Sequence, residues 1–275
     1  MGLRIATNVP SLATQRNLNA TGMEASKSFA RLSSGQRITK SGDDAAGLSI
    51  SNKLEASVRG MKMAQRNAND GISFVQTAEG GINEVSNILI RLRELSVQAA
   101  SDTIGDAERG FLNKEVQSLK GEIDRISKVT NYNGTNLLSG EGNVLTFQVG
   151  TEAGEMNRIE FDPTKTNVQA EALGVGSLDL SNKEGALESL GSLDEAIKRV
   201  NENRSELGAL QNRLHSTSTS IGIAVENLSD AKSRISDTDI AAETSTMIKN
   251  QILQNAGISV LAQANAAPNN ALKLL

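Results

Sequence analysis

One apolar stripe with helical spacing runs from Asp43 to about Ala100, and it limits what this chain can form more than any other feature. Its residues recur at steps of three, four or seven, which places them on one side of an α-helix. They are Leu54, Val58, Met61, Ala68, Ile72, Val75, Ile82, Val85, Leu89, Leu92 and Leu95. At 1.5 Å per residue the helix would be roughly 85 Å long. Because such a helix cannot bury its stripe on a compact core, the pattern predicts a bundle or coiled coil. Gln65 and Glu79 interrupt the stripe, and we interpret them as residues that fix the register of the helices, at some cost in stability.

Two later segments continue the helical spacing. After a turn at residues 101–106, apolar residues in three–four steps predict a second helix that folds back on the first as an antiparallel hairpin. They are Leu112, Val116, Leu119, Ile123 and Ile126. From residue 190 a heptad that stays in phase predicts a third long helix. Its residues are Leu190, Leu193, Ile197, Val200, Leu207, Leu214, Ile221, Val225, Leu228 and Ile235. A weaker stripe follows from Ile240 to Ala267.

Residues 140–180 change from helical spacing to alternation. Apolar and polar residues alternate around Phe147 and again around Phe161, with a glycine-containing connection between them. This predicts a β-hairpin whose second strand ends at Pro163, and we expect it to cap one end of the bundle. Just before it, Asn133-Gly134 is a strong turn signal. The predicted fold class is therefore mainly α, a long antiparallel helical bundle or coiled coil with a small β-hairpin region in the middle of the chain.

Composition agrees with helices that pack through aliphatic seams. Aromatic residues make up 2% of the chain, with no Trp and one Tyr, whereas a globular enzyme of this size normally fills its core with aromatics. Three prolines in 275 residues leave room for long helices. The absence of cysteine excludes disulfides, thiolate nucleophiles and Cys-ligated zinc. The net charge of −4 argues against a nucleic-acid binder, which is usually basic. The sequence shows no membrane span and no cleavable signal peptide.

The two ends of the chain carry weaker stripes than its middle. In residues 1–40, polar residues interrupt the apolar spacing, and six basic residues stand against Glu24 alone. This is either a solvated basic face or an end segment that packs only against other subunits. Such a stripe cannot offset its ordering entropy alone, so we expect both ends to be disordered in the monomer. The expected organisation is a terminal domain built from residues 1–42 and 236–275, with a helical rod domain at residues 43–235 and both chain ends at one pole.

No group of residues has the composition of a catalytic or metal site. His215 is the only histidine, and its place on a regular helix indicates an exposed residue without a catalytic partner. Ser41 or Asp43 suits the N-cap of the long helix, and Asp43 with Asp44 suits its positive end better than a metal site. We therefore expect no enzyme activity, no cofactor and no bound metal.

Several stretches, taken in order, resemble bacterial flagellin. They are Arg31-Leu-Ser-Ser-Gly-Gln-Arg-Ile, Asp43-Asp-Ala-Ala-Gly, Arg66-Asn-Ala-Asn-Asp-Gly-Ile-Ser, Arg91-Leu-Arg-Glu-Leu-Ser-Val-Gln, Glu122-Ile-Asp-Arg, Leu207-Gly-Ala-Leu-Gln-Asn-Arg-Leu, Ala231-Lys-Ser-Arg-Ile and Gln251-Ile-Leu-Gln-Asn-Ala-Gly-Ile-Ser-Val-Leu-Ala-Gln-Ala-Asn. Together they span roughly residues 4–138 and 187–275. The resemblance implies a self-assembling subunit of the bacterial flagellar filament used for motility. In that family the terminal helices form an inner coiled-coil domain, and the neighbouring helices with a β-hairpin form the next domain.

The resemblance also implies a route out of the cell and a set of partners. The subunit would leave unfolded through the flagellar type III export channel and act in the extracellular filament. Its partners would be other flagellin subunits, an export chaperone, the export apparatus and the filament cap. The chain lacks the bulky outer domains of large flagellins, has Ala6 where Asn is usual, and ends at Leu275 without the frequent final polar residue. The alternatives are a hook–filament junction protein, which has similar ends, and a secreted helical effector or adhesin, which would not polymerise.

Two sets of residues are expected to contact other molecules. Apolar residues of the two ends are expected to carry assembly: Ile5, Val9, Leu12, Ile258, Leu261, Leu272, Leu274 and Leu275. By resemblance, Arg91, Leu95 and Glu115 correspond to the site at which the animal Toll-like receptor for flagellin recognises many flagellins. Arg91 and Leu95 are four residues apart and share a helix face, while Glu115 is expected on the antiparallel second helix. In the alternative reading Leu95 belongs to the core stripe and Arg91 pairs with Glu115, or the three contact another subunit.

Overall fold

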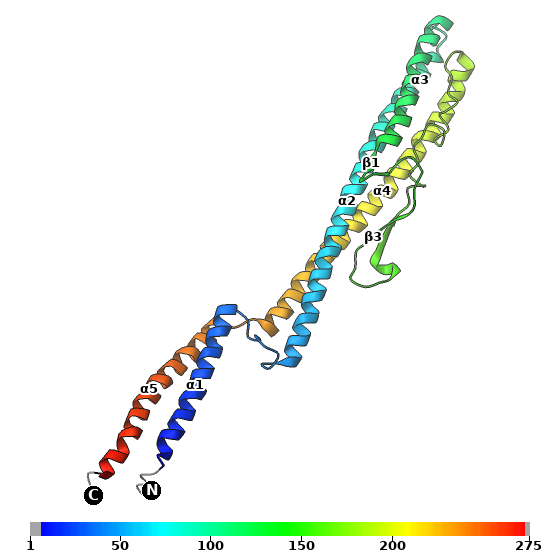
Figure 1. Cartoon of the computed structure of the whole chain (residues 1–275). Coiled ribbons are helices and arrows are strands. Elements are labelled where there is room, and N and C mark those ends of the chain that lie inside the picture. The colour runs from blue at the N-terminus through cyan, green and yellow to red at the C-terminus, as the bar shows by residue number, and fades with distance from the viewer. Residues whose placement is uncertain (1–6, 273–275) are drawn as a thin grey trace. The chain divides into compact units, whose positions relative to one another are not determined.

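Long helices follow the periodic segments of the sequence, and short strands occupy the middle of the chain (Figure 1). The computed structural model describes residues 7–272 and the side chains of residues 7–266. Its elements are α1 (Val9–Ser34), α2 (Ala45–Ala99), α3 (Asp106–Val129), β1 (Asn131–Tyr132), β2 (Thr135–Asn136), β3 (Leu145–Gln148), the 3₁₀ helix η1 (Glu155–Asn157), β4 (Arg158–Phe161), α4 (Lys183–Ser236) and α5 (Ile240–Leu272). The predicted fold class, mainly α with a small antiparallel hairpin, is confirmed.

The chain divides into two compact units, which are described separately. One unit combines Met1–Ser57 with Asn227–Leu275, and the other is Val58–Glu226. The breaks between helices lie at residues 35–44 and 237–239. The expected boundary between a terminal and a rod domain stays a prediction.

The apolar stripe of α2 forms one side of the core in Val58–Glu226, facing α3 and α4. Its residues Val75, Ile82, Val85, Leu89, Leu92 and Leu95 are at most 1% exposed. Burying each of them contributes about 1.5–3 kcal/mol. Where the stripe is interrupted, Gln65 Nε2 donates to the carbonyl of Ser218 on α4 at 3.3 Å. This polar residue therefore ties α2 to α4 at one register.

A buried arginine holds the turn between α2 and α3. The guanidinium of Arg109 donates to the carbonyls of Ala99 at 2.8 Å and Ser101 at 2.9 Å, and to the carboxylate of Asp106 at 2.8 Å. It thus occupies the carbonyl of Ala99, which has no partner within α2, and a second carbonyl in the turn that follows. The turn brings α3 back along α2, as the spacing predicts.

Two hairpins follow α3. In the first, Asn133 and Gly134 both have positive φ, 49° and 80°, which is the geometry of a type I′ turn and explains the Asn-Gly signal. In the second, β3 pairs antiparallel with β4, with Leu145 opposite Phe161.

The β3–β4 hairpin lies against the side of α2, so the expectation that it caps the bundle was wrong. Phe147 and Phe161 make edge-to-face contacts with Phe74 of α2, at centroid distances of 5.5 and 4.9 Å. Asn67 of α2 also donates to the carbonyl of Gln148 at 3.0 Å. The two aromatic side chains find their apolar contact within the length of α2, which holds the hairpin there.

The segment between β4 and α4 has no regular structure but is part of the core. It buries Val168, Leu173, Val175, Leu178 and Leu180.

In the unit that contains both chain ends, the two helix breaks lie side by side. Gly35 ends α1 with a left-handed φ of 71°, a conformation that glycine adopts without strain. The next residue, Gln36, forms an antiparallel bridge with Asp237, which precedes α5. The end of α1 and the beginning of α5 are therefore joined directly.

Asp44 caps α2, which corrects the expectation of Ser41 or Asp43. Its Oδ1 accepts the backbone N–H of Gly47 at 2.8 Å. Asp43 turns back instead, and its carboxylate accepts Lys27 Nζ at 2.9 Å and the backbone N–H of Thr39 at 3.2 Å. The Lys27 ammonium, together with the hydroxyl and backbone N–H of Thr39, holds the pKa of Asp43 well below its usual range.

Candidate assembly surface

Helices α1 and α5 lie side by side (Figure 1), and small and polar residues contribute much of the seam between them. The buried residues of α1 are Ser11 and Ser28. Ser11 Oγ donates to Asn265 Oδ1 at 2.8 Å, and Asn8 Nδ2 donates to the carbonyl of Ala264 at 2.8 Å. Along the same seam, Gly257 approaches the side chain of Leu18. The fully buried residues of α1 are thus small and polar, while four larger apolar residues of the two helices are only partly buried: Leu18, Leu32, Met247 and Leu261.

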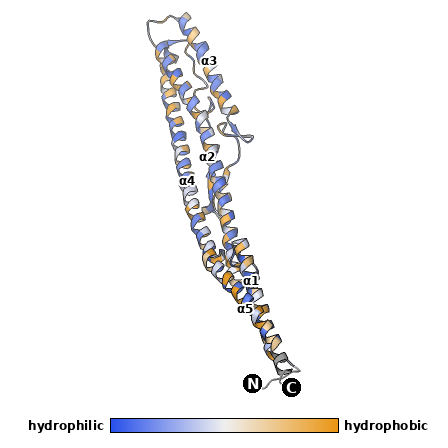
Figure 2. Ribbon diagram, turned by 90° about the vertical axis from the view of Figure 1, so that its left-hand side faces the viewer, coloured by the Kyte–Doolittle hydropathy of each residue, from blue (hydrophilic) through white to orange (hydrophobic). Residues whose placement is uncertain are grey.

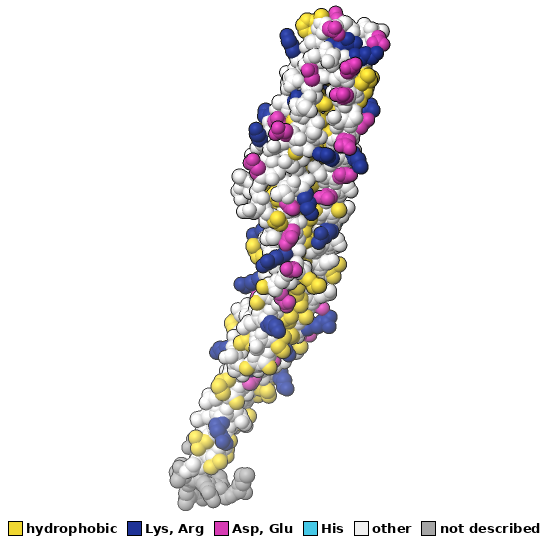
Figure 3. Space-filling view, turned by 90° about the vertical axis from the view of Figure 1, so that its right-hand side faces the viewer, with side chains coloured by type: hydrophobic (Ala, Val, Ile, Leu, Met, Phe, Trp, Pro, Cys, Tyr) yellow, Lys and Arg dark blue, Asp and Glu magenta, His cyan; other side chains and the backbone are white. Residues whose placement is uncertain are grey.

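Those larger side chains face outward. On α1 they are Val9, Leu12, Met23 and Phe29, and on α5 they are Ile240, Ile248, Ile252, Leu253, Ile258 and Val260, each about half exposed or more. Figure 2 shows hydrophobic residues over much of α5, and Figure 3 shows apolar side chains on the surface of the pair. A protein that stays monomeric rarely exposes so many large apolar side chains along one element. These ten residues are distributed around the exposed sides of the two helices, and we call them together the apolar face of the α1–α5 pair.

The residues predicted to carry assembly fall partly on this face. Val9, Leu12 and Ile258 belong to it, and Leu261 is partly buried. The other four predicted residues, Ile5, Leu272, Leu274 and Leu275, have side chains outside the described residues.

Sequence reasoning missed several residues of the face, Phe29 and Ile252 among them. The sequence does contain a sign of them, because large apolar residues recur throughout residues 9–34 and 240–260, between the polar residues.

The three residues predicted to meet a receptor lie near one another, but they do not share a surface. Arg91 donates through Nε and Nη2 to Glu115 Oε1 at 3.1 and 3.0 Å, and both side chains are about half exposed. A further bond joins Arg91 to Glu94 at 3.1 Å, and the bonds from Glu115 and Glu94 raise the pKa of Arg91. Leu95 is 1% exposed and belongs to the core.

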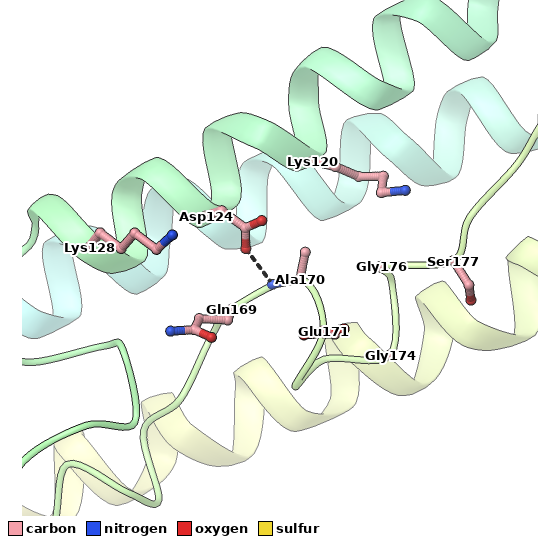
Figure 4. Close-up of a pocket in the computed structure, with 9 residues that line it drawn as sticks. All are labelled: Lys120, Asp124, Lys128, Gln169, Ala170, Glu171, Gly174, Gly176 and Ser177. Carbon is pink, nitrogen blue, oxygen red and sulfur yellow. Dashed lines mark hydrogen bonds between the residues drawn. The ribbon is translucent and has the colours of Figure 1, made fainter.

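A polar cavity of about 660 Å³ lies between α3 and the loop at residues 169–177 (Figure 4). Lys120, Asp124 and Lys128 of α3 line one side of it, and Glu171 lies on the loop. Asp124 accepts the backbone N–H of Ala170 at 2.9 Å, which anchors the loop to α3. Two acids balance the two lysines, so the cavity has no marked preference for a charged ligand.

Within residues 7–272, no three His, Asp or Glu side chains gather as metal ligands. No helix in this range has the length and apolar character needed to cross a bilayer. His215 is exposed on α4.

Comparison with known proteins identifies the chain at both ends. Residues 5–143 match the family model of the bacterial flagellin N-terminal helical region, and residues 190–275 match that of the bacterial flagellin C-terminal helical region. A flagellin from Halalkalibacterium halodurans is 42% identical over 98% of each chain.

Among solved structures, Bacillus cereus flagellin is 30% identical, with a TM-score of 0.50 over 57% of this chain and 88% of that one. A putative flagellar hook-associated protein from Vibrio parahaemolyticus has a TM-score of 0.59 over 71% of this chain and all of that one, at 15% identity. That second likeness concerns the fold alone.

Proposed function

The chain belongs to the bacterial flagellin family, and on this basis we propose that it is a structural subunit that self-assembles into the flagellar filament for motility. The observation that carries the proposal is the α1–α5 pair, which buries serines and exposes large apolar side chains. Further copies of the chain would cover that face. The family is structural, in keeping with a subunit that works by packing. The hook–filament junction protein and the secreted effector are not favoured, because the identity to a flagellin extends over nearly the whole chain.

Assembly on this face would couple folding to binding. Among the side chains that the structure describes, neither α1 nor α5 fully buries a large apolar residue, so the pair gains only limited apolar burial from its own contact. Residues 1–40 and 236–275 would therefore be mobile in the monomer and become helical as they enter the filament. Hydrogen exchange compares the two states directly. Equal protection of these residues in monomer and filament would contradict the proposal.

The remaining partners follow from the role of a filament subunit. The chain would be exported unfolded through the flagellar type III channel with the help of a chaperone, and added beneath the filament cap outside the cell. Residues 1–42 with 236–275 would form the inner core of the filament, and residues 43–235 the rod around it. Supporting this division, both breaks in the helices lie close to its boundaries.

A matched pair of methionines tests the apolar face. Met23 is 69% exposed on α1, and Met156 is fully exposed at η1. If neighbouring subunits cover Met23, Met23→Gln removes roughly 1.5–3 kcal/mol of burial and raises the critical concentration for polymerisation about tenfold or more. Met156→Gln makes the same chemical change and should leave polymerisation unaltered. Electron microscopy and sedimentation measure both, and equal polymerisation by the two variants would refute the assignment of the face.

The Toll-like receptor for flagellin remains a proposed partner, now through Arg91 and Glu115. Leu95 would support this surface from the core without touching the receptor. Arg93 offers a matched control, because it is also about half exposed and pairs with Asp194 at 2.7 Å. Monomers with Arg91→Ala should lose receptor signalling, whereas monomers with Arg93→Ala should keep it. Full signalling by a folded Arg91→Ala variant would remove this site.

A further inference from the structure

We propose that the paired helix breaks form a clasp that sets the register of α1 against α5, with Arg37 as its positioning residue. The clasp consists of residues 35–38 and 235–238. The proposal rests on the proposed function, because it concerns how the end helices of a subunit become ordered during filament growth.

Backbone hydrogen bonds hold the two strands of the clasp together. Arg37 N–H donates to the carbonyl of Ser236 at 2.7 Å, and Thr238 N–H donates to the carbonyl of Gly35 at 2.9 Å. These bonds flank the bridge between Gln36 and Asp237. They fix which residue at the end of α1 lies opposite which residue at the start of α5.

The side chain of Arg37 adds a contact that the backbone cannot make. Its Nε and Nη2 both donate to the carbonyl of Ile235, at 3.2 and 2.7 Å, across a sequence separation of 198 residues. Ile235 lies in the last turn of α4, where carbonyls lack helical partners and the helix end is negative. The guanidinium therefore caps α4 and determines where the chain turns into α5. A lysine brings the same charge but lacks the planar fork.

Ion pairs reinforce the same end of the α1–α5 pair. Arg31, in the last turn of α1, lies 3.5 Å from Glu243, in the first turn of α5. One turn earlier, Lys27 binds Asp43 ahead of α2. Closing the clasp carries the entropy cost of bringing two distant segments of the chain together. Each later helical turn of α1 and α5 then forms contacts between helices that are already in register, without that cost. Ordering then proceeds from the clasp toward the chain ends.

Seeded elongation of filaments tests the role of Arg37. The variants are Arg37→Ala, Arg37→Lys and the matched control Arg234→Ala, which removes an arginine that pairs with Asp230 on the surface of α4 at 2.6 Å. Arg37→Ala should elongate roughly three- to tenfold more slowly than wild type, as expected for loss of an exposed charged hydrogen bond at a helix end. The elongation rate of Arg37→Lys should lie between those of Arg37→Ala and wild type, and that of Arg234→Ala should match wild type. Calorimetric unfolding of Val58–Glu226 should be the same in all four proteins.

The outcomes separate the clasp from the proposed function. Elongation of Arg37→Ala at the wild-type rate would overturn the clasp while leaving the filament role intact. Elongation of Arg37→Lys at the wild-type rate would show that the planar guanidinium is not needed. Slow elongation of Arg234→Ala would show that the effect is not specific to Arg37. If wild type itself did not elongate, the proposed function would fail, and the role of the clasp in growth with it.

Pulsed hydrogen exchange during elongation tests the direction of ordering. In wild type, amides in residues 24–34 and 240–250 should become protected before those in residues 9–19 and 258–266. In Arg37→Ala, protection of all four segments should be delayed. Simultaneous or reversed protection in wild type would overturn ordering from the clasp.

Discussion

Gly80 and Gly81 are neighbours on α2 whose replacement by alanine should have clearly different effects on stability. A Cβ at Gly80 meets no atom within 4 Å. A Cβ at Gly81 would lie 2.7 Å from Leu138 Cδ1 and 2.7 Å from Thr130 Oγ1. The two positions therefore share a helix and a substitution and differ in the space beside them.

The magnitudes follow from two terms. Replacing glycine by alanine inside a helix stabilises it by about 1 kcal/mol, and this term is common to both variants. At Gly81 an overpacking cost of about 1–3 kcal/mol is added. Its neighbours cannot easily give way, because Leu138 is fully buried and Thr130 Oγ1 is held by a 2.8 Å bond to the carbonyl of Ile126. The difference between the two variants isolates this cost.

Differential scanning calorimetry of the monomer measures the difference. For a unit of this size, 1 kcal/mol shifts the unfolding temperature by about 2–4 °C. Gly80→Ala should therefore raise the temperature by a few degrees, while Gly81→Ala should fall below Gly80→Ala by about 2–12 °C. Equal unfolding temperatures for the two variants would refute the packing of α2 against Leu138 and Thr130.

Three further predictions concern other contacts. Leu95→Ala should lower the free energy of unfolding by about 2–5 kcal/mol, and a calorimetric loss below about 1 kcal/mol would contradict its place in the core. Arg109→Met should destabilise the α2–α3 turn by roughly 1.5–3 kcal/mol or more, whereas Arg125→Met, which removes an exposed pair with Glu122, should leave the unfolding temperature nearly unchanged. Asp43 has a lowered pKa, chiefly through the bond from Lys27, so its tie to α1 is present at neutral pH, persists below the usual aspartate pKa of about 3.9 and is lost only as pH falls through the lower folded value. In filaments, where α1 is ordered, a solid-state NMR titration of the Asp43 carboxyl with a midpoint near 3.9 would contradict this.

Periodicity predicted the long helices because their burial follows one repeating face. Ile82 and Leu89 of the α2 stripe are fully buried, and the alternation around Phe147 became β3. The motifs at residues 31–125 and 207–265 also indicate the family, since their order along the chain is itself specific.

The parts that sequence could not predict are those where burial has no period. Val168, Leu173 and Leu180 enter the core from irregular backbone, so their spacing carries no helical or strand signal. Deleting residues 140–180 would therefore remove buried side chains from the core of Val58–Glu226. The deletion would weaken the filament by destabilising the subunit as well as by removing surface contacts. The seam of α1 with α5 could not be predicted for a related reason: the fully buried residues of α1 are Ser11 and Ser28, which hydropathy counts as surface residues.

The N-cap of α2 could not be predicted from residue types alone. Asp43 and Asp44 are equally good N-caps by residue type. Which of them caps the helix depends on Lys27, a residue from the preceding helix that draws Asp43 away.

The aromatic cluster on Phe74 also makes Tyr132 a built-in optical reporter. The chain has no tryptophan and a single tyrosine, and the ring of Tyr132 lies edge-on to Phe74 at a centroid distance of 5.6 Å within Val58–Glu226. Tyrosine emission therefore follows this unit alone, while far-ultraviolet circular dichroism sums the helices of both units. If residues 1–40 and 236–275 are mobile in the monomer, both signals should melt together there, and a separate far-ultraviolet transition would show that the α1–α5 pair is already folded.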